Sequence, residues 1–216
     1  MDDRCDIFDF HITNLILFGI KISNVLSIIL ICDLTFIQPQ FTRNKMTSIR
    51  PANTTDFKLL AEIGRQTFIE AHHKSAAQSD IDFYVDKKYN PDTVFNELEN
   101  PDNIYHLIYH NTQPAGYSKI ILNSGHSNIK NKNVTKLERL YLLKEFYELK
   151  LGKELFNFNV DLSKKNNQSG MWLFVWKGNE RAIRFYEKTG FKIIGSYDFE
   201  ISPTHSNPNH QLFLEY

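Results

Sequence analysis

Cysteine is almost absent from this chain of 216 residues. The sequence holds two cysteines, Cys5 and Cys32, and both lie within the first 33 residues. A disulfide framework is therefore excluded for the rest of the chain, and so is a cysteine nucleophile. The histidines do not replace the missing thiols as metal ligands, because His72 and His73 stand alone as a pair without companion ligands. We therefore predict no metal site.

An excess of charge of either sign is also missing. The sequence has 25 basic and 25 acidic side chains, which give a formal net charge of zero. The chain as a whole therefore lacks the electrostatic attraction on which binding to nucleic acid or to an anionic membrane depends. We expect a small-molecule partner, and neither nucleic acid nor a membrane.

An uninterrupted apolar segment long enough to cross a membrane is missing as well. Lys21 and Asp33 interrupt the most apolar segment, 12–37, and leave 11 uncharged residues between them, whereas a spanning helix needs about 20. Acidic residues at the start of the chain argue against a secretory signal. We interpret 1–45 as an N-terminal extension, either an amphipathic or partner-binding appendage or residues upstream of a true start at Met46. We expect one cytoplasmic domain over 46–216.

The order of local patterns after Met46 predicts an α/β domain. Helical spacing of apolar residues and alternating patterns follow one another in a fixed order along the chain. A short strand comes first, then two or three helices, three strands of an antiparallel meander, a helix, a buried strand and another helix. The chain closes with a strand, a loop rich in Pro, Asn and His, and the last strand, 211–216. Strand–helix–strand units in the second half imply some parallel pairing there.

The helix nearest the C-terminus carries the most specific motif. The stretch "NERAIRFYEKTGF", 179–191, opens with Asn179 and has Gly190 where a left-handed residue ends a helix. This stretch resembles the C-terminal motif of the GNAT superfamily of acyl-CoA-dependent N-acyltransferases. The resemblance extends over 46–216 and is nearest to the branches that act on polyamines and related small amines. It implies an α/β (α+β) fold with a mixed, mostly antiparallel central sheet of six to seven strands flanked by about four helices.

The resemblance also implies a reaction and its residues. An acetyl group would pass directly from acetyl-CoA to a primary amine of a polyamine-like small molecule, with Tyr186 as the acid for the departing thiolate and Asn179 bonded to the pantetheine arm. An alkylammonium has a pKa of about 10.4, so its proton must be removed. Glu138 is the expected base, through a water, and the alternative for Glu138 is a structural carboxylate paired with a cation. A backbone N–H at or near Leu142 would hold the oxyanion.

Glycine is scarce where the family has a glycine-rich turn. In "EFYELKLGKELF", 145–156, the only glycine is Gly152, and Lys150 takes the place of the family's first glycine. Backbone N–H groups at a helix start bind phosphate oxygens, so we expect the turn to bind the coenzyme still. We also predict that glycine at Glu148 and Lys150 would tighten that binding. The expected coenzyme-binding residues are Leu140, Tyr141, Leu142, Tyr147, Glu148, Leu149, Lys150, Leu151, Gly152, Lys153, Asn179 and Tyr186.

Two questions stay open at the level of sequence. The altered turn allows a non-catalytic acyl-CoA-binding sensor or interaction domain as the alternative function, whereas the complete motif at 179–191 favours the enzyme. Exposed strands of the last hairpin could mediate a homodimer. Four carboxylates could line an acidic approach for a polyamine or form a solvated helix face: Glu70, Asp80, Asp82 and Asp86.

Overall fold

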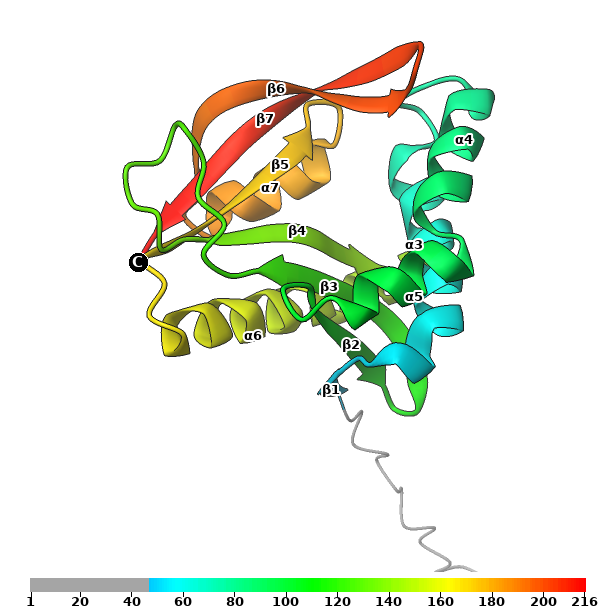
Figure 1. The fold of residues 1–216 in the computed structure, drawn as a ribbon, viewed down its shortest axis with the longest axis horizontal. Coiled ribbons are helices and arrows are strands. Elements are labelled where there is room, and N and C mark those ends of the chain that lie inside the picture. Colours follow the sequence, from blue (N-terminus) through cyan, green and yellow to red (C-terminus); the bar gives the residue numbers. More distant parts are fainter. Residues whose placement is uncertain (1–46) are drawn as a thin grey trace, which may run out of the picture. The chain divides into compact units, whose positions relative to one another are not determined.

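One seven-stranded sheet with helices on both faces forms the protein over the residues that the structure, a computed structural model, describes, 47–216 (Figure 1). The interpreted extension at 1–45 and the proposed start at Met46 lie outside the described residues. The strands are β1 (Thr47–Pro51), β2 (Ile104–His110), β3 (Gln113–Ile121), β4 (Thr135–Leu142), β5 (Gly170–Trp176), β6 (Lys192–Ser202) and β7 (His205–Glu215). The helices are η1 (Thr54–Asp56), α3 (Phe57–His72), α4 (Gln78–Lys88), α5 (Pro91–Glu99), η2 (Lys144–Leu149), α6 (Leu151–Lys165) and α7 (Glu180–Lys188).

The sheet is antiparallel except at its centre. Its order is β1-β2-β3-β4-β5-β7-β6, and β4 and β5 are the parallel neighbours. These two strands pair at only two positions, Thr135 with Met171 and Lys136 with Trp172. Beyond Lys136 they separate, and the sheet opens between them. The expected mixed, mostly antiparallel sheet is confirmed, with five α-helices in the described part of the chain rather than about four.

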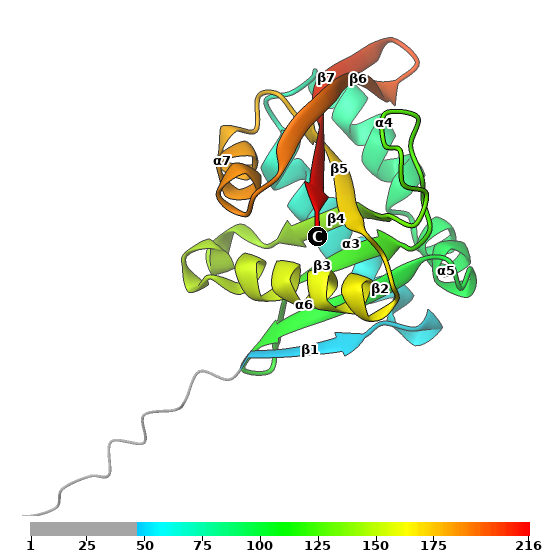
Figure 2. The same ribbon diagram turned by 90° about the vertical axis from the view of Figure 1, so that its left-hand side faces the viewer.

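The two faces of the sheet are covered by different helices (Figures 1 and 2). Neighbouring residues of β3 show this, because successive side chains of a strand point to opposite faces. Ser118 contacts Asn159 of α6 at 3.2 Å, whereas the Tyr117 hydroxyl lies 3.3 Å from that of Tyr89, which ends α4. Hence α6 covers one face, and α3, α4 and α5 cover the other.

Local signals in the sequence determine where two of the helices start. Asn53 and Asp56 form a capping box before α3, as their spacing predicts. Asn90 caps α5 by accepting from the Thr93 N–H at 2.8 Å, and Pro91 takes the first helical position. In each case a side-chain oxygen satisfies a backbone N–H that has no partner within the helix.

The expected loop of Asn, Pro and His before the last strand is wrong. β7 already begins at His205, and β6 and β7 form a tight hairpin. The segment is extended because it has a strand on each side: Asn209 pairs with Trp176 of β5 and with Tyr197 of β6. The sheet therefore supplies the hydrogen bonds that the local composition does not predict.

Candidate active site

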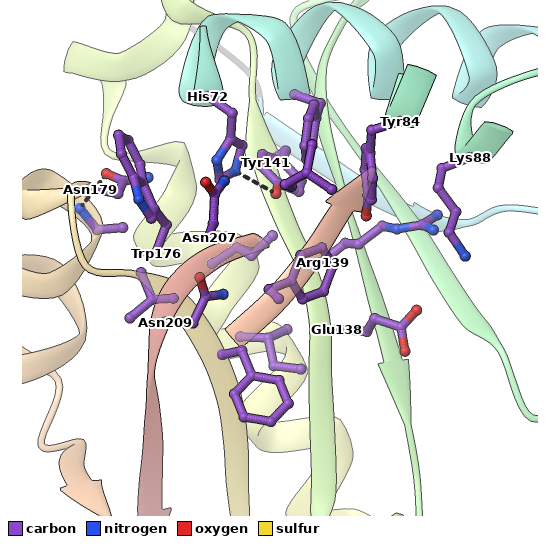
Figure 3. Close-up of a pocket in the computed structure, with 18 of the residues that line it drawn as sticks. His72, Tyr84, Lys88, Glu138, Arg139, Tyr141, Trp176, Asn179, Asn207 and Asn209 are labelled. Carbon is purple, nitrogen blue, oxygen red and sulfur yellow. Dashed lines mark hydrogen bonds between the residues drawn. The ribbon is translucent and has the colours of Figure 1, made fainter. Parts of the chain in front are cut away.

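A cavity of about 320 Å³ lies where β4 and β5 separate (Figure 3). Its walls come from both of these strands, from α3, α4 and α7, and from the hairpin of β6 and β7. The polar and charged residues that line it are His72, Tyr84, Lys88, Tyr89, Lys136, Glu138, Arg139, Tyr141, Asn179, Tyr186, Asn207 and Asn209. Of the expected site residues, Glu138, Leu140, Tyr141, Asn179 and Tyr186 meet here, whereas the expected turn residues 147–153 do not line the cavity.

A bulge in β4 brings two successive charged residues to the same face. Lys119 pairs with Arg139 and Ile120 pairs with Leu137, so Glu138 has no partner on β3. In a regular strand, Glu138 and Arg139 would point to opposite faces of the sheet. Instead both contact side chains on the face that carries α5. The bulge therefore places a carboxylate and a guanidinium together at the cavity.

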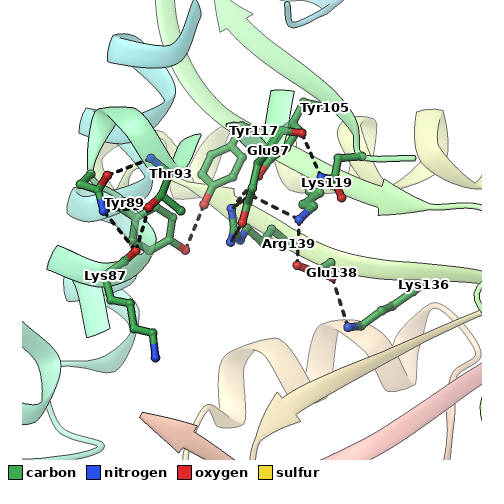
Figure 4. A network of polar contacts seen from close by, with 12 residues as sticks. Lys87, Tyr89, Thr93, Glu97, Tyr105, Tyr117, Lys119, Lys136, Glu138 and Arg139 are labelled. Carbon is green, nitrogen blue, oxygen red and sulfur yellow. Dashed lines mark hydrogen bonds and ion pairs between the residues drawn. The ribbon is translucent and has the colours of Figure 1, made fainter. Parts of the chain in front are cut away.

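A network of charges joins α5 to strands β2 to β4 (Figure 4). The Arg139 guanidinium donates to both carboxylate oxygens of Glu97, at 2.9 and 3.1 Å, and to the Tyr105 hydroxyl at 2.6 Å. The Tyr105 hydroxyl in turn donates to Glu97. Lys119 Nζ lies between two carboxylates, 3.3 Å from Glu97 and 3.0 Å from Glu138. These buried charges are thus paired, which offsets the cost of removing them from water.

The contacts of Glu138 determine its protonation. Its Oε1 accepts from Lys119, and its Oε2 accepts from Lys136 at 3.2 Å. Burial by itself raises the pKa of Glu138, but the two lysines outweigh burial and lower that pKa to about 2. A carboxylate with so low a pKa accepts a proton weakly near neutral pH. The role of Glu138 as a base stays a prediction, and its contacts are those of the alternative, a structural carboxylate paired with cations.

Tyr186 lies in α7 and Asn179 directly precedes this helix, and both residues line the cavity. Tyr186 is buried, and burial raises the pKa of its hydroxyl. The hydroxyl is therefore protonated at neutral pH, as a general acid must be, although the raised pKa makes it a weaker acid than an ordinary tyrosine. Asn179 caps α7, since its Oδ1 accepts from the Ala182 N–H at 3.1 Å. The cap uses the oxygen of the amide, so its nitrogen remains as a donor.

His72 is a cavity residue that the sequence analysis considered only as a metal ligand. Its ring stacks on Phe68 with centroids 4.4 Å apart, and its Nε2 lies 3.3 Å from the Tyr141 hydroxyl. Burial lowers the pKa of His72 to about 4, so the imidazole is neutral at pH 7. Its Nδ1 is buried without a hydrogen-bond partner among the described residues. His72 lies four residues after the buried Phe68, on the same face of α3, and this spacing is the signal that could have placed His72 here.

Lys88, Asn207 and Asn209 also line the cavity, and the sequence patterns did not predict them as site residues. The asparagines were missed because their segment was expected to be a loop. Asn207, Asn209 and Gln211 are spaced two residues apart, as side chains on one face of a strand are, and this spacing could have predicted that all three lie on the same face of the sheet. The Oδ1 of Asn209 is buried at the cavity without a partner among the described residues, so it can accept a hydrogen bond from a ligand. Lys88 is the last residue of α4, and no sequence pattern around it indicates that it lines a cavity.

The expected pyrophosphate turn has the backbone of a glycine turn without the glycine. Lys150 has a φ of 61°, in the left-handed region, and α6 starts directly after it at Leu151. The carbonyl of Lys150 accepts from the N–H groups of Lys153 and Glu154, at 3.0 and 3.3 Å. No side chain caps this helix end. The first N–H groups of α6 thus remain available for an anion.

Two contacts connect this turn with the rest of the site. The Arg181 guanidinium of α7 lies over the ring of Tyr147, 3.4 Å from its centroid. At the start of α6, a Cβ added to Gly152 would lie 3.4 Å from the Leu142 side chain at the end of β4. The turn therefore packs between β4 and α7, the two elements that also supply Tyr141 and Tyr186 to the cavity.

A central sheet that opens between two parallel strands is the fold of solved N-acetyltransferases. The PaiA N-acetyltransferase from Thermoplasma acidophilum, solved in complex with coenzyme A, aligns with a TM-score of 0.63 and 22% identity, over 79% of this chain and 99% of that protein. The ribosomal-protein-S18-alanine N-acetyltransferase from Escherichia coli aligns with a TM-score of 0.55 and 16% identity, over 79% of this chain and 94% of that protein. These similarities establish the fold.

Sequence comparison identifies the family. Residues 67–191, more than half of the chain, match the acetyltransferase (GNAT) family. The protein belongs to this family of N-acetyltransferases. An uncharacterized N-acetyltransferase in the pepI 3′ region of Lactobacillus delbrueckii subsp. lactis is 29% identical over 137 residues, 63% of this chain and 79% of the relative. A spermidine N(1)-acetyltransferase from Thermoplasma acidophilum is 26% identical over 149 residues, 67% of this chain and 88% of the relative.

Proposed function

We propose that this N-acetyltransferase moves an acetyl group from acetyl-CoA to the primary amine of a small molecule by direct attack. The amine nitrogen bonds to the acetyl carbon, the carbon–sulfur bond breaks, the amine loses a proton and the thiolate gains one. The observation that carries the proposal is the cavity between the separated strands β4 and β5, with the Tyr186 hydroxyl in its wall. The spermidine relative supports an amine as the acceptor.

The start of α6 is the proposed site for the pyrophosphate of acetyl-CoA. Its first N–H groups have no side-chain cap, and the positive end of the helix dipole favours an anion there. Lys150, Lys153 and Arg181 add positive charge around the turn, and Glu148 opposes them. The free amide nitrogen of Asn179 would donate to the pantetheine arm, and the backbone N–H of Leu142 is the proposed donor to the oxyanion.

Proton removal from the amine has two proposed acceptors. Glu138 is the base expected from the sequence, and the neutral His72 is the second. With a pKa of about 4, His72 is the stronger base of the two, because the pKa of Glu138 is about 2. The cations of the cavity also lower the pKa of a bound ammonium, which makes either transfer less unfavourable. We therefore place His72, acting directly or through Tyr141, ahead of Glu138.

The glycine-poor turn, with Lys150 in place of the family's first glycine, favours a second candidate function, a non-catalytic acyl-CoA sensor. Calorimetry with acetyl-CoA, combined with a thiol-release assay over a panel of amines, separates the two. The proposed enzyme binds acetyl-CoA and releases thiol only when an amine is present. Binding without thiol release for any amine would favour the sensor, and absence of binding would refute both.

A further inference from the structure

We propose that the amine accepted by this enzyme carries an anionic group such as a carboxylate, and that Lys88 binds this group. The inference rests on the proposed acetyl transfer and names the class of its acceptor. It departs from the polyamine-like acceptor expected from the sequence. The observation that carries it is the charge of the cavity wall.

Cations outnumber carboxylates among the described residues that line the cavity. Lys88, Lys136 and Arg139 line it, together with a single carboxylate, that of Glu138. His72 adds no charge at pH 7, because its imidazole is neutral. A cavity with excess positive charge attracts an anion and repels a second ammonium group.

The one carboxylate is already fully engaged. Glu138 Oε1 accepts from Lys119 at 3.0 Å, and Oε2 accepts from Lys136 at 3.2 Å. A second ammonium of a polyamine would have to displace one of these lysines and leave its charge unpaired, which is costly where both partners are largely buried. Other carboxylates do not offer a second ammonium a binding partner in the cavity. None of the four that could have formed an acidic approach lines it: Glu70, Asp80, Asp82 and Asp86.

Lys88 is the cation that a ligand can use. Arg139 is held by both oxygens of Glu97, and Lys136 is paired with Glu138. Lys88 forms no ion pair with any described residue, and it is half-buried at the cavity wall. An ammonium group in such a place binds a carboxylate through charge-assisted hydrogen bonds, which are about twice as strong as neutral ones.

The cavity has two chemically different ends, which would orient such a substrate. Asn179 and Trp176 lie at one end, and Lys88 and Glu138 lie at the other (Figure 3). An anion at Lys88 would direct the amine of the same molecule toward the end where α7 contributes to the wall. There the buried Oδ1 of Asn209, which lacks a partner among the described residues, can accept a hydrogen bond from the amine.

Matched acceptors test the substrate class with the full-length enzyme. Each set contains an α- or ω-amino acid, its carboxamide and the diamine of the same length, and kcat/KM is measured by thiol release. We expect the kcat/KM of the amino acid to exceed those of its carboxamide and of the diamine by about tenfold or more in at least one set. Equal or higher kcat/KM for the diamines in every set would overturn the inference and leave the proposed function intact. Absence of thiol release with every acceptor in every set would refute the proposed function itself.

Variants at two neighbouring lysines test the role of Lys88. In Lys88→Gln, the ratio of kcat/KM for the carboxylate over its carboxamide should fall about tenfold, and Lys88→Arg should restore most of it. Lys87→Gln is the matched control, because Lys87 is exposed, extends over the ring of Phe83 and does not line the cavity. Melting temperatures of the variants verify folding. An unchanged ratio in a folded Lys88→Gln would remove Lys88 from the proposal.

Discussion

Tyr186 is the single residue on which proton delivery in the proposed reaction depends most. Its buried hydroxyl has a raised pKa and lines the cavity. We predict that Tyr186→Phe lowers kcat by about 100-fold, since general acid catalysis contributes on the order of that factor or more. Binding of acetyl-CoA, measured by calorimetry, should be retained. Tyr197→Phe, at an exposed position of β6, is the control and should leave kcat unchanged. A Tyr186→Phe enzyme with normal kcat would remove Tyr186 as the acid.

His72 makes stability depend on pH. Its pKa in the folded protein, about 4, lies below its ordinary value of 6.5, so the unfolded chain takes up the proton first as pH falls. The contribution of His72 to stability is therefore complete above pH 6.5 and is lost between pH 6.5 and pH 4, by up to about 3 kcal/mol. Urea unfolding at several pH values should show a smaller loss in His72→Gln than in wild type. His73→Gln, at the exposed neighbouring residue, should keep the wild-type dependence, and identical profiles for all three proteins would contradict this prediction.

At the scale of elements, one side chain connects α5 to the sheet. Glu97 neutralises both Arg139 and Lys119, which are largely buried in the network of Figure 4. We predict that Glu97→Gln lowers the free energy of unfolding by about 3 kcal/mol, because it leaves buried cations without their counter-charge. Glu99→Gln, at an exposed position on the same helix, should change stability by less than about 0.5 kcal/mol. The free energies of unfolding are measured with urea. A similarly small change in both variants would mean that water or movement of the chain replaces the lost counter-charge of Glu97.

The junction of η2 and α6 stores backbone strain at Lys150. A side chain with a φ of 61° costs roughly 1–2 kcal/mol, and glycine avoids this cost although it loses more chain entropy on folding. We predict that Lys150→Gly raises the free energy of unfolding by up to about 1 kcal/mol. Lys153→Gly, inside α6, should instead lower it by about 1 kcal/mol. Destabilisation by Lys150→Gly would show that its side chain has contacts that outweigh the strain. Glu148 lies outside the left-handed region, so glycine there relieves no strain.

For the molecule as a whole, the described residues 47–216 supply a seven-stranded sheet and the wall of the cavity. We propose that 46–216 forms the acetyltransferase domain. A chain that starts at Met46 should keep the melting temperature and the kcat/KM of the full-length protein, because no group at the cavity is removed. A lower melting temperature or a loss of activity would show that 1–45 contributes to the folded enzyme. None of the described helices is long and apolar enough to cross a membrane.

Local sequence patterns predict the order of elements, the capped helix starts and the helix that carries the motif at 179–191. These follow from signals between residues close along the chain, such as helical spacing, a cap three residues ahead or a glycine at a helix end. The charge of the cavity, in contrast, depends on which side chains meet after folding. Glu138 contacts two lysines because of the bulge in β4 and the neighbouring strand β3. Lys88 comes from α4, and Asn209 comes from the hairpin of β6 and β7. A pKa and a binding preference depend on groups that meet only after folding, so local sequence patterns cannot specify them.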